Sequence, residues 1–249
     1  MRGGLDRRGF LRAAVALPLA AAACTSTPAA APAPLPTTVG AGAASAVPPP
    51  QRTGELVHAG SGRPQVALTF HGAGDLDLAR RVLTVLHDRG AVVTVLAVGT
   101  WLQHYPDAAR LVTDLGHELG NHTWSHPDLA ALGRDGIRTE IERCRDRIAA
   151  ATGGPGAFFR PSQAQHATPE IRAIAAAAGY PTVLSYDIDS RDFTDPGPAA
   201  VRRNVAPVAA GGVVSMHLGH PGTLAALPGL LDDLAARGLA PVTASTLFG

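Results

Sequence analysis

The sequence predicts an α/β fold, a distorted (β/α) barrel of the TIM type with about seven strands. Three observations indicate this fold. From residue 64 onward, short apolar runs rich in β-branched residues alternate with longer amphipathic stretches. Several of these stretches end at a glycine, as helices often do. Polar residues gather directly after the apolar runs, and parallel barrels place their sites at those strand ends.

Strands are expected where Val, Ile, Leu and Thr cluster in short runs between turn-forming residues. In chain order these runs are Gln65–Phe70, Ala91–Val98, His117–Asn121, Ala157–Arg160, Pro181–Tyr186, Gly212–His217 and Pro241–Thr243. Helices are expected between them, because apolar residues recur there at helical spacing. In chain order these stretches are Leu76–Arg89, Trp101–Leu115, Asp135–Ala151, Pro169–Ala178, Ala199–Ala209 and Leu224–Arg237.

Residues 1–24 indicate a signal peptide of the twin-arginine type. Arg7 and Arg8 precede the apolar run Ala13–Ala23, which is too short to span a bilayer. Cys24 follows small residues, so this segment resembles a bacterial lipoprotein cleavage site, at which Cys24 is lipidated. Cleavage by an ordinary signal peptidase is the alternative. In both cases we expect an exported protein, either extracellular or anchored to the cell envelope.

Residues 25–60 are rich in Ala and Pro and nearly free of charge, which predicts a disordered linker. Residues 61–249 are then expected to form the folded domain. This domain holds 16 arginines against 18 acidic residues and has no basic stripe. A charge so close to neutral gives no reason to expect nucleic acid as a partner. We expect a monomer whose only membrane contact is the N-terminal lipid anchor.

Two histidines in one loop form the first candidate site. His122 and His126 lie four residues apart between Gly120 and Pro127, after an apolar run. Imidazoles at this spacing can bind one divalent cation, most readily zinc, at about 2.0–2.1 Å. Cobalt and nickel suit the same type of site. Trp124, between the two histidines, is interpreted either as wall packing or as a substrate platform.

Four further polar segments close other predicted strands. A barrel brings the ends of these strands together, although the segments are spread over about 145 residues. Because every segment lies at a strand end, we expect them to share one pocket with the histidine pair. The segments are Thr69–Asp75, Phe159–Pro161, Asp187–Phe193 and Met216–Leu218.

These residues resemble the polysaccharide deacetylases of carbohydrate esterase family four, the chitooligosaccharide-deacetylase homology domain. The resemblance covers about residues 62–247 and rests on Gly116–His126, Phe158–Pro161, Asp189–Asp192 and the run Leu227–Thr243. It implies a hydrolase that uses a divalent metal, often zinc, to remove N- or O-acetyl groups from sugars. The implied partner is an acetylated polysaccharide or oligosaccharide of the cell envelope or the environment.

The resemblance also implies roles for individual residues. His122 and His126 correspond to the metal ligands. Arg160 corresponds to the arginine that orients the catalytic carboxylate. His217 corresponds to the general acid that protonates the leaving amine, and Asp192 to the carboxylate that keeps His217 charged.

Two differences from the family concern the substrate side of the site. The family segment Arg-Pro-Pro-Tyr-Gly is replaced by Arg160-Pro161-Ser162-Gln163-Ala164. The oxyanion donor of this segment is a backbone N–H, so Gln163 can still provide it. Phe193 stands where the family usually has Trp. We therefore expect the contact with the sugar to differ from that of the family.

The first motif departs from the family pattern in a way that concerns catalysis. The family has Thr-Phe-Asp-Asp, with the first Asp as base and the second as third metal ligand. This chain has Thr69-Phe70-His71-Gly72. Zinc sites generally have at least three protein ligands. In one interpretation, Asp75 reaches back as third ligand or as base, and His71 takes the other role.

Two other interpretations stay open. The site catalyses a different hydrolysis, or the domain is a pseudoenzyme that only binds glycan. We favour an active deacetylase, because a purely binding protein has no chemical need for His217, Asp192 and Arg160 beside two ligand histidines. Asp75 also suits the N-cap of the helix expected from Leu76, and one residue can serve both purposes.

Overall fold

The structure is a computed structural model and describes residues 54–249. The twin-arginine segment, Cys24 and the linker up to residue 53 lie outside the described residues and stay predictions. Among residues 54–249, no helix is long and apolar enough to cross a membrane.

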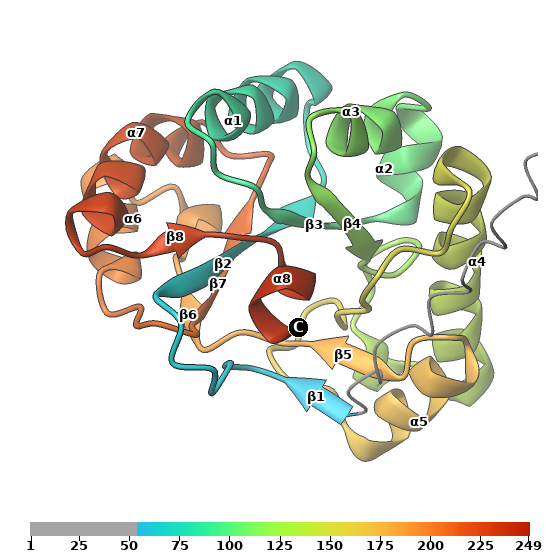
Figure 1. Cartoon of the computed structure of the whole chain (residues 1–249). Helices are drawn as coiled ribbons and strands as arrows, with labels where there is room; N and C mark the ends of the chain where they lie inside the picture. Colours follow the sequence, from blue (N-terminus) through green and yellow to red (C-terminus); the bar gives the residue numbers. More distant parts are fainter. Residues whose placement is uncertain (1–53) are drawn as a thin grey trace, which may run out of the picture. The chain divides into compact units, whose positions relative to one another are not determined.

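Parallel strands form the centre of the described part (Figure 1). Strand β2 lies in the middle, with β3 on one side and β7 on the other. In this register His71 is opposite Leu96 of β3 and His217 of β7. Strand β4 continues the sheet beyond β3, and β6 continues it beyond β7. The bounds are β2 (Gln65–Gly72), β3 (Thr94–Ala97), β4 (Glu118–Asn121), β6 (Ile188–Asp189), β7 (Val213–His217) and β8 (Ala240–Pro241), which pairs with the start of β2.

Two more strands, β1 (Gly54–Leu56) and β5 (Thr182–Leu184), pair with each other. Phe159 connects this pair to the larger sheet through parallel bridges to Asn121 at the end of β4 and to Val183 in β5. The strand order is therefore β1, β5, Phe159, β4, β3, β2, β7, β6. This order of parallel strands confirms the predicted distorted (β/α) barrel.

Most helices lie outside the strands, whereas the last one, α8, is drawn in the middle of the ring of strands (Figure 1). The starts of the helices carry the expected signals, such as the N-cap Asp75 before α1 and the N-cap Thr168 before α5, which begins with Pro169. The bounds are α1 (Leu76–Asp88), α2 (Gly99–His104), α3 (Ala108–Asp114), α4 (Arg134–Thr152), α5 (Pro169–Ala177), α6 (Pro198–Val205), α7 (Pro221–Ala236) and α8 (Ala244–Phe248), with 3₁₀ turns η1 (Leu129–Ala131) and η2 (Asp192–Thr194).

Two expected elements differ in the structure. The single helix expected over Trp101–Leu115 is two helices, α2 and α3. Pro106 separates them, because proline has no N–H and pushes the preceding Tyr105 out of the helical region. The strand expected over Ala157–Arg160 reduces to the bridges of Phe159.

The fold begins earlier than the expected domain start at residue 61. Strand β1 lies within the segment expected as linker, and the N–H of Gly54 donates to the carbonyl of Pro181 at 3.0 Å. His58 bridges to Gly212, and Ala59 is buried. The signal for β1 is only three residues long, too short for a periodicity to be visible.

The core lies between the sheet and the helices, where apolar side chains of β2, β3 and β7 pack against those of α1 and α7. Leu68, Phe70 and Met216 are fully buried there. Each such side chain stabilises the fold by about 1.5–3 kcal/mol. The strands run parallel, so their C-terminal ends meet at one edge, and this edge carries the candidate site.

Candidate active site

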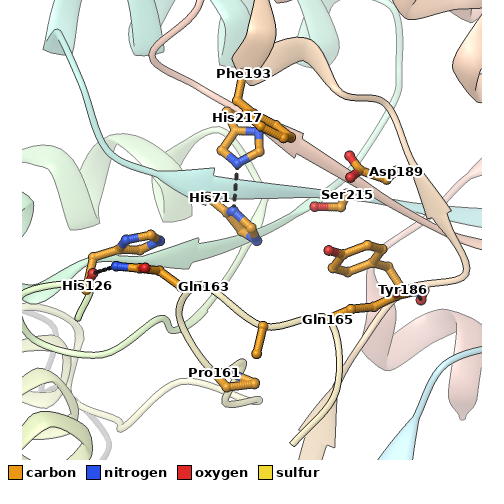
Figure 2. A pocket seen from close by; sticks show the side chains of 11 residues that line it. His71, His126, Pro161, Gln163, Gln165, Tyr186, Asp189, Phe193, Ser215 and His217 are labelled. Atoms are coloured by element: carbon orange, nitrogen blue, oxygen red, sulfur yellow. Dashed lines mark hydrogen bonds between the residues drawn. The ribbon is translucent and has the colours of Figure 1, made fainter. Parts of the chain in front are cut away.

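A cavity of about 270 Å³ opens at the C-terminal ends of the strands (Figure 2). Each of the five polar segments singled out in the sequence contributes to its wall, so the shared pocket predicted from the strand ends is present. The lining residues are His71, His126, Pro161, Gln163, Ala164, Gln165, Tyr186, Asp189, Phe193, Ser215 and His217.

His217 and Asp192 form a tightly bonded pair beside this cavity. Nδ1 of His217 donates to Oδ1 of Asp192 at 2.7 Å, and the backbone N–H of His217 donates to Oδ2 at 2.8 Å. The hydroxyl of Thr223, in the first turn of α7, donates to the same Oδ2 at 2.6 Å. Burial raises the pKa of Asp192, but the hydrogen bonds from His217 and from the Thr223 hydroxyl lower it further, to below its ordinary value. Asp192 is therefore ionised at neutral pH.

Arg160 lies fully buried behind the pocket. Its Nε donates to the carbonyl of Leu184 at 2.8 Å and its Nη2 to that of Ser185 at 3.1 Å. Its Nη1 lies 3.2 Å from Nε2 of His71. Burial lowers the pKa of Arg160 to about 9, so it is still a cation at neutral pH. The motif-one carboxylate that this arginine would orient is absent, and His71 takes that place.

The hydrogen bonds of His71 set the proton positions of the imidazoles of His71 and His217. A guanidinium only donates, so Nε2 of His71 accepts from Arg160 and the proton of His71 is on Nδ1. That Nδ1 lies 2.9 Å from Nε2 of His217, which must therefore accept. The proton of His217 is then on Nδ1, facing Asp192. In this arrangement His217 is a neutral imidazole, whereas the family resemblance implied a charged one.

His122 and His126 meet as the sequence predicted. Their ring centroids are 4.8 Å apart at an interplanar angle of 67°. Nδ1 of His122 donates to the carbonyl of Arg160 at 3.0 Å. Its Nε2 is buried and has no hydrogen-bond partner within residues 54–249. A ring oriented through one nitrogen, with a free lone pair on the other, has the form of a metal-binding histidine.

Burial lowers the pKa of both histidines below the ordinary value of 6.5, and that of His122 well below it. Both rings are therefore neutral at neutral pH, which is the form that binds a metal. His126 adopts a left-handed backbone conformation with φ 59°, as do Thr123 and Gln163 with φ of 68° and 56°. Such strained residues cluster at functional sites. The pair fits two ligands of a divalent cation.

The carboxylate expected to complete the metal site is elsewhere. Asp75 is exposed and caps α1, with Oδ1 accepting from the N–H of Leu78 at 2.8 Å. It is not among the residues that line the pocket. As they stand in the described part, no three His, Cys, Asp or Glu side chains are grouped to hold a metal ion. The helix-cap interpretation of Asp75 is confirmed by this bond, and its ligand role stays a prediction.

Gly72, at the position of the family's second aspartate, leaves no room for a side chain. A Cβ there would lie 2.9 Å from Cγ1 of Val95 and 3.0 Å from Cα of Ala97. The neighbouring strand β3 therefore lies too close to Gly72 for a Cβ to fit without a shift of β3. The third ligand cannot be restored there without moving β3.

The three residues expected on the substrate side lie in different surroundings. Gln163 lines the pocket, and its side-chain Nε2 donates to the carbonyl of His126 at 3.0 Å. Phe193 also lines it, 46% exposed, with its ring 5.3 Å from that of His217. Trp124 does not line it. The guanidinium carbon of Arg143 lies 4.2 Å from the ring centroid of Trp124, a contact that favours the wall-packing interpretation.

Sequence reasoning missed Thr223 and Tyr186. Thr223 holds Asp192 from 31 residues away, and nothing in the local sequence of α7 indicates this contact. Tyr186 lines the pocket in front of Arg160, whose guanidinium carbon lies 5.2 Å from the tyrosine ring centroid. Burial raises the pKa of Tyr186, so its hydroxyl is protonated and can donate. Its place at the end of the predicted fifth strand was an available signal.

Comparison with known proteins shows to which family the chain belongs. The family model for polysaccharide deacetylase matches residues 58–183. A chitooligosaccharide deacetylase of Sinorhizobium fredii is 30% identical over 72% of this chain and 90% of its own length. The solved family 4 carbohydrate esterase from Streptomyces lividans, in complex with acetate, is 30% identical, with TM-score 0.67 over 71% of this chain and 90% of that one.

A solved CE4 family pseudoenzyme from Bacillus anthracis shares the fold, with TM-score 0.74 and 24% identity over 80% of this chain and 70% of that one. The barrel, the family match and the 30% identity over most of a curated relative lead to one conclusion. The chain belongs to the polysaccharide deacetylase family, with an altered first motif.

Proposed function

We propose that the protein is a metal-dependent hydrolase that removes N- or O-linked acetyl groups from a polysaccharide or oligosaccharide. The observation that carries this proposal is the buried Nε2 of His122, which has no partner within the described part. His71 connects His122 to the bonded pair of His217 and Asp192, because its ring stacks on His122 and its Nδ1 bonds to Nε2 of His217. A ligand nitrogen close to an acid–base pair is what metal-assisted amide or ester hydrolysis requires.

His122 and His126 would hold the metal, most readily zinc. A metal held there would act as a Lewis acid, which polarises the acetyl carbonyl and makes water easier to deprotonate. Nε2 of His217, neutral and oriented by Asp192, takes the proton from the attacking water. It then gives that proton to the leaving nitrogen or oxygen as the bond to the acetyl carbon breaks. The products are acetate and the free amine or hydroxyl.

Phe193 and Gln163 complete the site on the substrate side. The exposed ring of Phe193 offers an apolar face to a sugar ring next to His217. The backbone N–H of Gln163 can stabilise the oxyanion. We propose further that the protein is monomeric and that, as the first 24 residues predict, it is exported and tethered to the cell envelope through Cys24.

Acetate release tests the proposal. The full-length chain, treated with chelator and then supplied with zinc, is incubated with N-acetylated chitooligosaccharides, peptidoglycan or acetylated xylan. We expect acetate from at least one of them, and a loss of at least about 100-fold in rate in His217→Gln. His104→Gln, at an exposed position in α2, serves as the matched control and should retain full activity. Equal rates for His217→Gln and wild type would refute the assignment.

A second candidate function is glycan binding without catalysis. Gly72 leaves no room for a ligand carboxylate, and Asp75 is engaged as the cap of α1. Binding of an acetylated glycan in calorimetry, with no acetate released from any of the three substrates, would favour this candidate.

A further inference from the structure

His71 lies between the two halves of the site. Its ring stacks on that of His122, with centroids 4.0 Å apart and an interplanar angle of 25°. On its other side it bonds to His217 and Arg160. It is therefore the side chain in contact both with a proposed metal ligand and with the proposed acid–base residue.

Two histidines are too few ligands for a stable zinc site, which generally has three from the protein. The two carboxylate positions considered from the sequence do not supply the third. Gly72 has no room for one, and the carboxylate of Asp75 caps α1 outside the pocket lining. Besides His126, His71 is the ligand-type side chain among the lining residues that touches His122.

Ring separations show how far His71 is from a ligand position. Two imidazoles on one tetrahedral zinc ion, each bonded at about 2.0–2.1 Å, have ring centroids about 5 Å apart. His122 and His126, at 4.8 Å, already have this spacing. His71 and His122, at 4.0 Å and nearly parallel, do not. The ring of His71 must therefore rotate until its centroid is about 1 Å farther from that of His122, so that both rings can bind the same ion.

We propose that His71 is the third ligand of the divalent metal, and that its turn toward the metal releases Nε2 of His217 for catalysis. This inference rests on the metal dependence proposed above. The same rotation cannot keep Nδ1 of His71 at 2.9 Å from His217 and its Nε2 at 3.2 Å from Arg160. Metal binding and exposure of the catalytic nitrogen are thus linked, and each favours the other.

A cobalt titration tests the ligand assignment without reference to activity. The full-length chain is stripped with chelator and titrated with cobalt(II), whose visible absorption reports its ligand geometry. We expect one ion per chain in the wild type and at least about 100-fold weaker binding in His71→Asn, more than the loss of a supporting bond costs. Asp75→Ser is the matched control, because serine retains the helix cap but removes the carboxylate. It should bind as the wild type does.

Other outcomes of the titration overturn the inference. Weak binding in Asp75→Ser with normal binding in His71→Asn would make Asp75 the ligand. Equal binding in all three proteins would exclude both residues. If the wild type binds no cobalt yet releases acetate, the inference fails while the deacetylase function stands. If His71→Asn is unfolded by circular dichroism, the decision rests on the wild-type measurement below.

The second measurement follows His217 in the wild-type protein by ¹⁵N NMR of its histidine rings. Addition of zinc should change the Nε2 shift of His217 from that of a nitrogen accepting a hydrogen bond to that of a solvent-exposed one. Its Nδ1, still bonded to Asp192, should change little. Zinc binding that leaves the Nε2 shift of His217 unchanged would overturn the proposed release.

Discussion

Replacing Thr223 by valine tests the support of Asp192, the least visible part of the site in the sequence. Asp192 is fully buried and accepts three hydrogen bonds, of which the Thr223 hydroxyl provides one at 2.6 Å. Valine has nearly the same shape, so the change removes the bond without opening a cavity. A hydrogen bond to a charged group contributes about 1.5–3 kcal/mol. We expect the free energy of unfolding to fall by that amount at pH 7.

The same loss has a pH signature. The hydroxyl stabilises the ionised carboxylate, so its removal raises the pKa of Asp192 toward its ordinary value. A group with a depressed pKa stabilises the fold above its unfolded pKa, and this stability is lost as the pH falls through the folded pKa. The difference in the free energy of unfolding between wild type and Thr223→Val should therefore have its full value at pH 7. It should shrink once Asp192 is protonated in both proteins.

Urea denaturation between pH 3 and pH 7 measures both effects. Thr223→Ser, which retains the hydroxyl, is the matched control and should lose at most about 1 kcal/mol through its missing methyl group. A Thr223→Val protein within about 0.5 kcal/mol of wild type at pH 7 would refute the reasoning. A loss that stays constant from pH 7 to pH 3 would refute it as well, because the bond would then not depend on the charge.

Three further predictions concern other parts of the molecule. Gly211→Ala should lower the free energy of unfolding by at least about 2 kcal/mol in urea titration, because its φ is 91° and the new Cβ would overlap the carbonyl oxygen of Ala59. Phe193→Ala should change the free energy of unfolding by less than about 0.5 kcal/mol but weaken glycan binding in calorimetry, whereas Phe193→Trp should bind glycan as the wild type does. Equal binding by wild type and both variants would contradict the sugar contact. Burial lowers the pKa of His71 and His122 well below 6.5, so below about pH 6.5 the unfolded chain takes up protons that the fold does not. Stability should therefore be full above this pH and fall as the pH is lowered, and His71→Gln should flatten that slope.

Much of the fold was readable from the sequence, because each element carries its own local signal. Strand β2 and helices α1 and α4 lie within a few residues of their expected bounds, since periodicity and caps are properties of neighbouring residues. The missed strands β1 and β6 are three and two residues long. Elements this short exist only through pairing with distant strands, so no local pattern indicates them.

The same division holds for the site. The sequence determined the barrel, the family and the meeting of His71, His126, Phe193 and His217 at one pocket, because parallel strands end at a common edge. Only the tertiary structure decided which polar atoms bond to which. In that structure the carboxylate of Asp75 caps α1, and β3 lies too close to Gly72 for a side chain there. A chain of hydrogen bonds runs from Arg160 through His71 and His217 to Asp192. Those outcomes depend on how segments far apart in the chain are placed relative to one another, to within a few tenths of an ångström. No local sequence pattern encodes that placement.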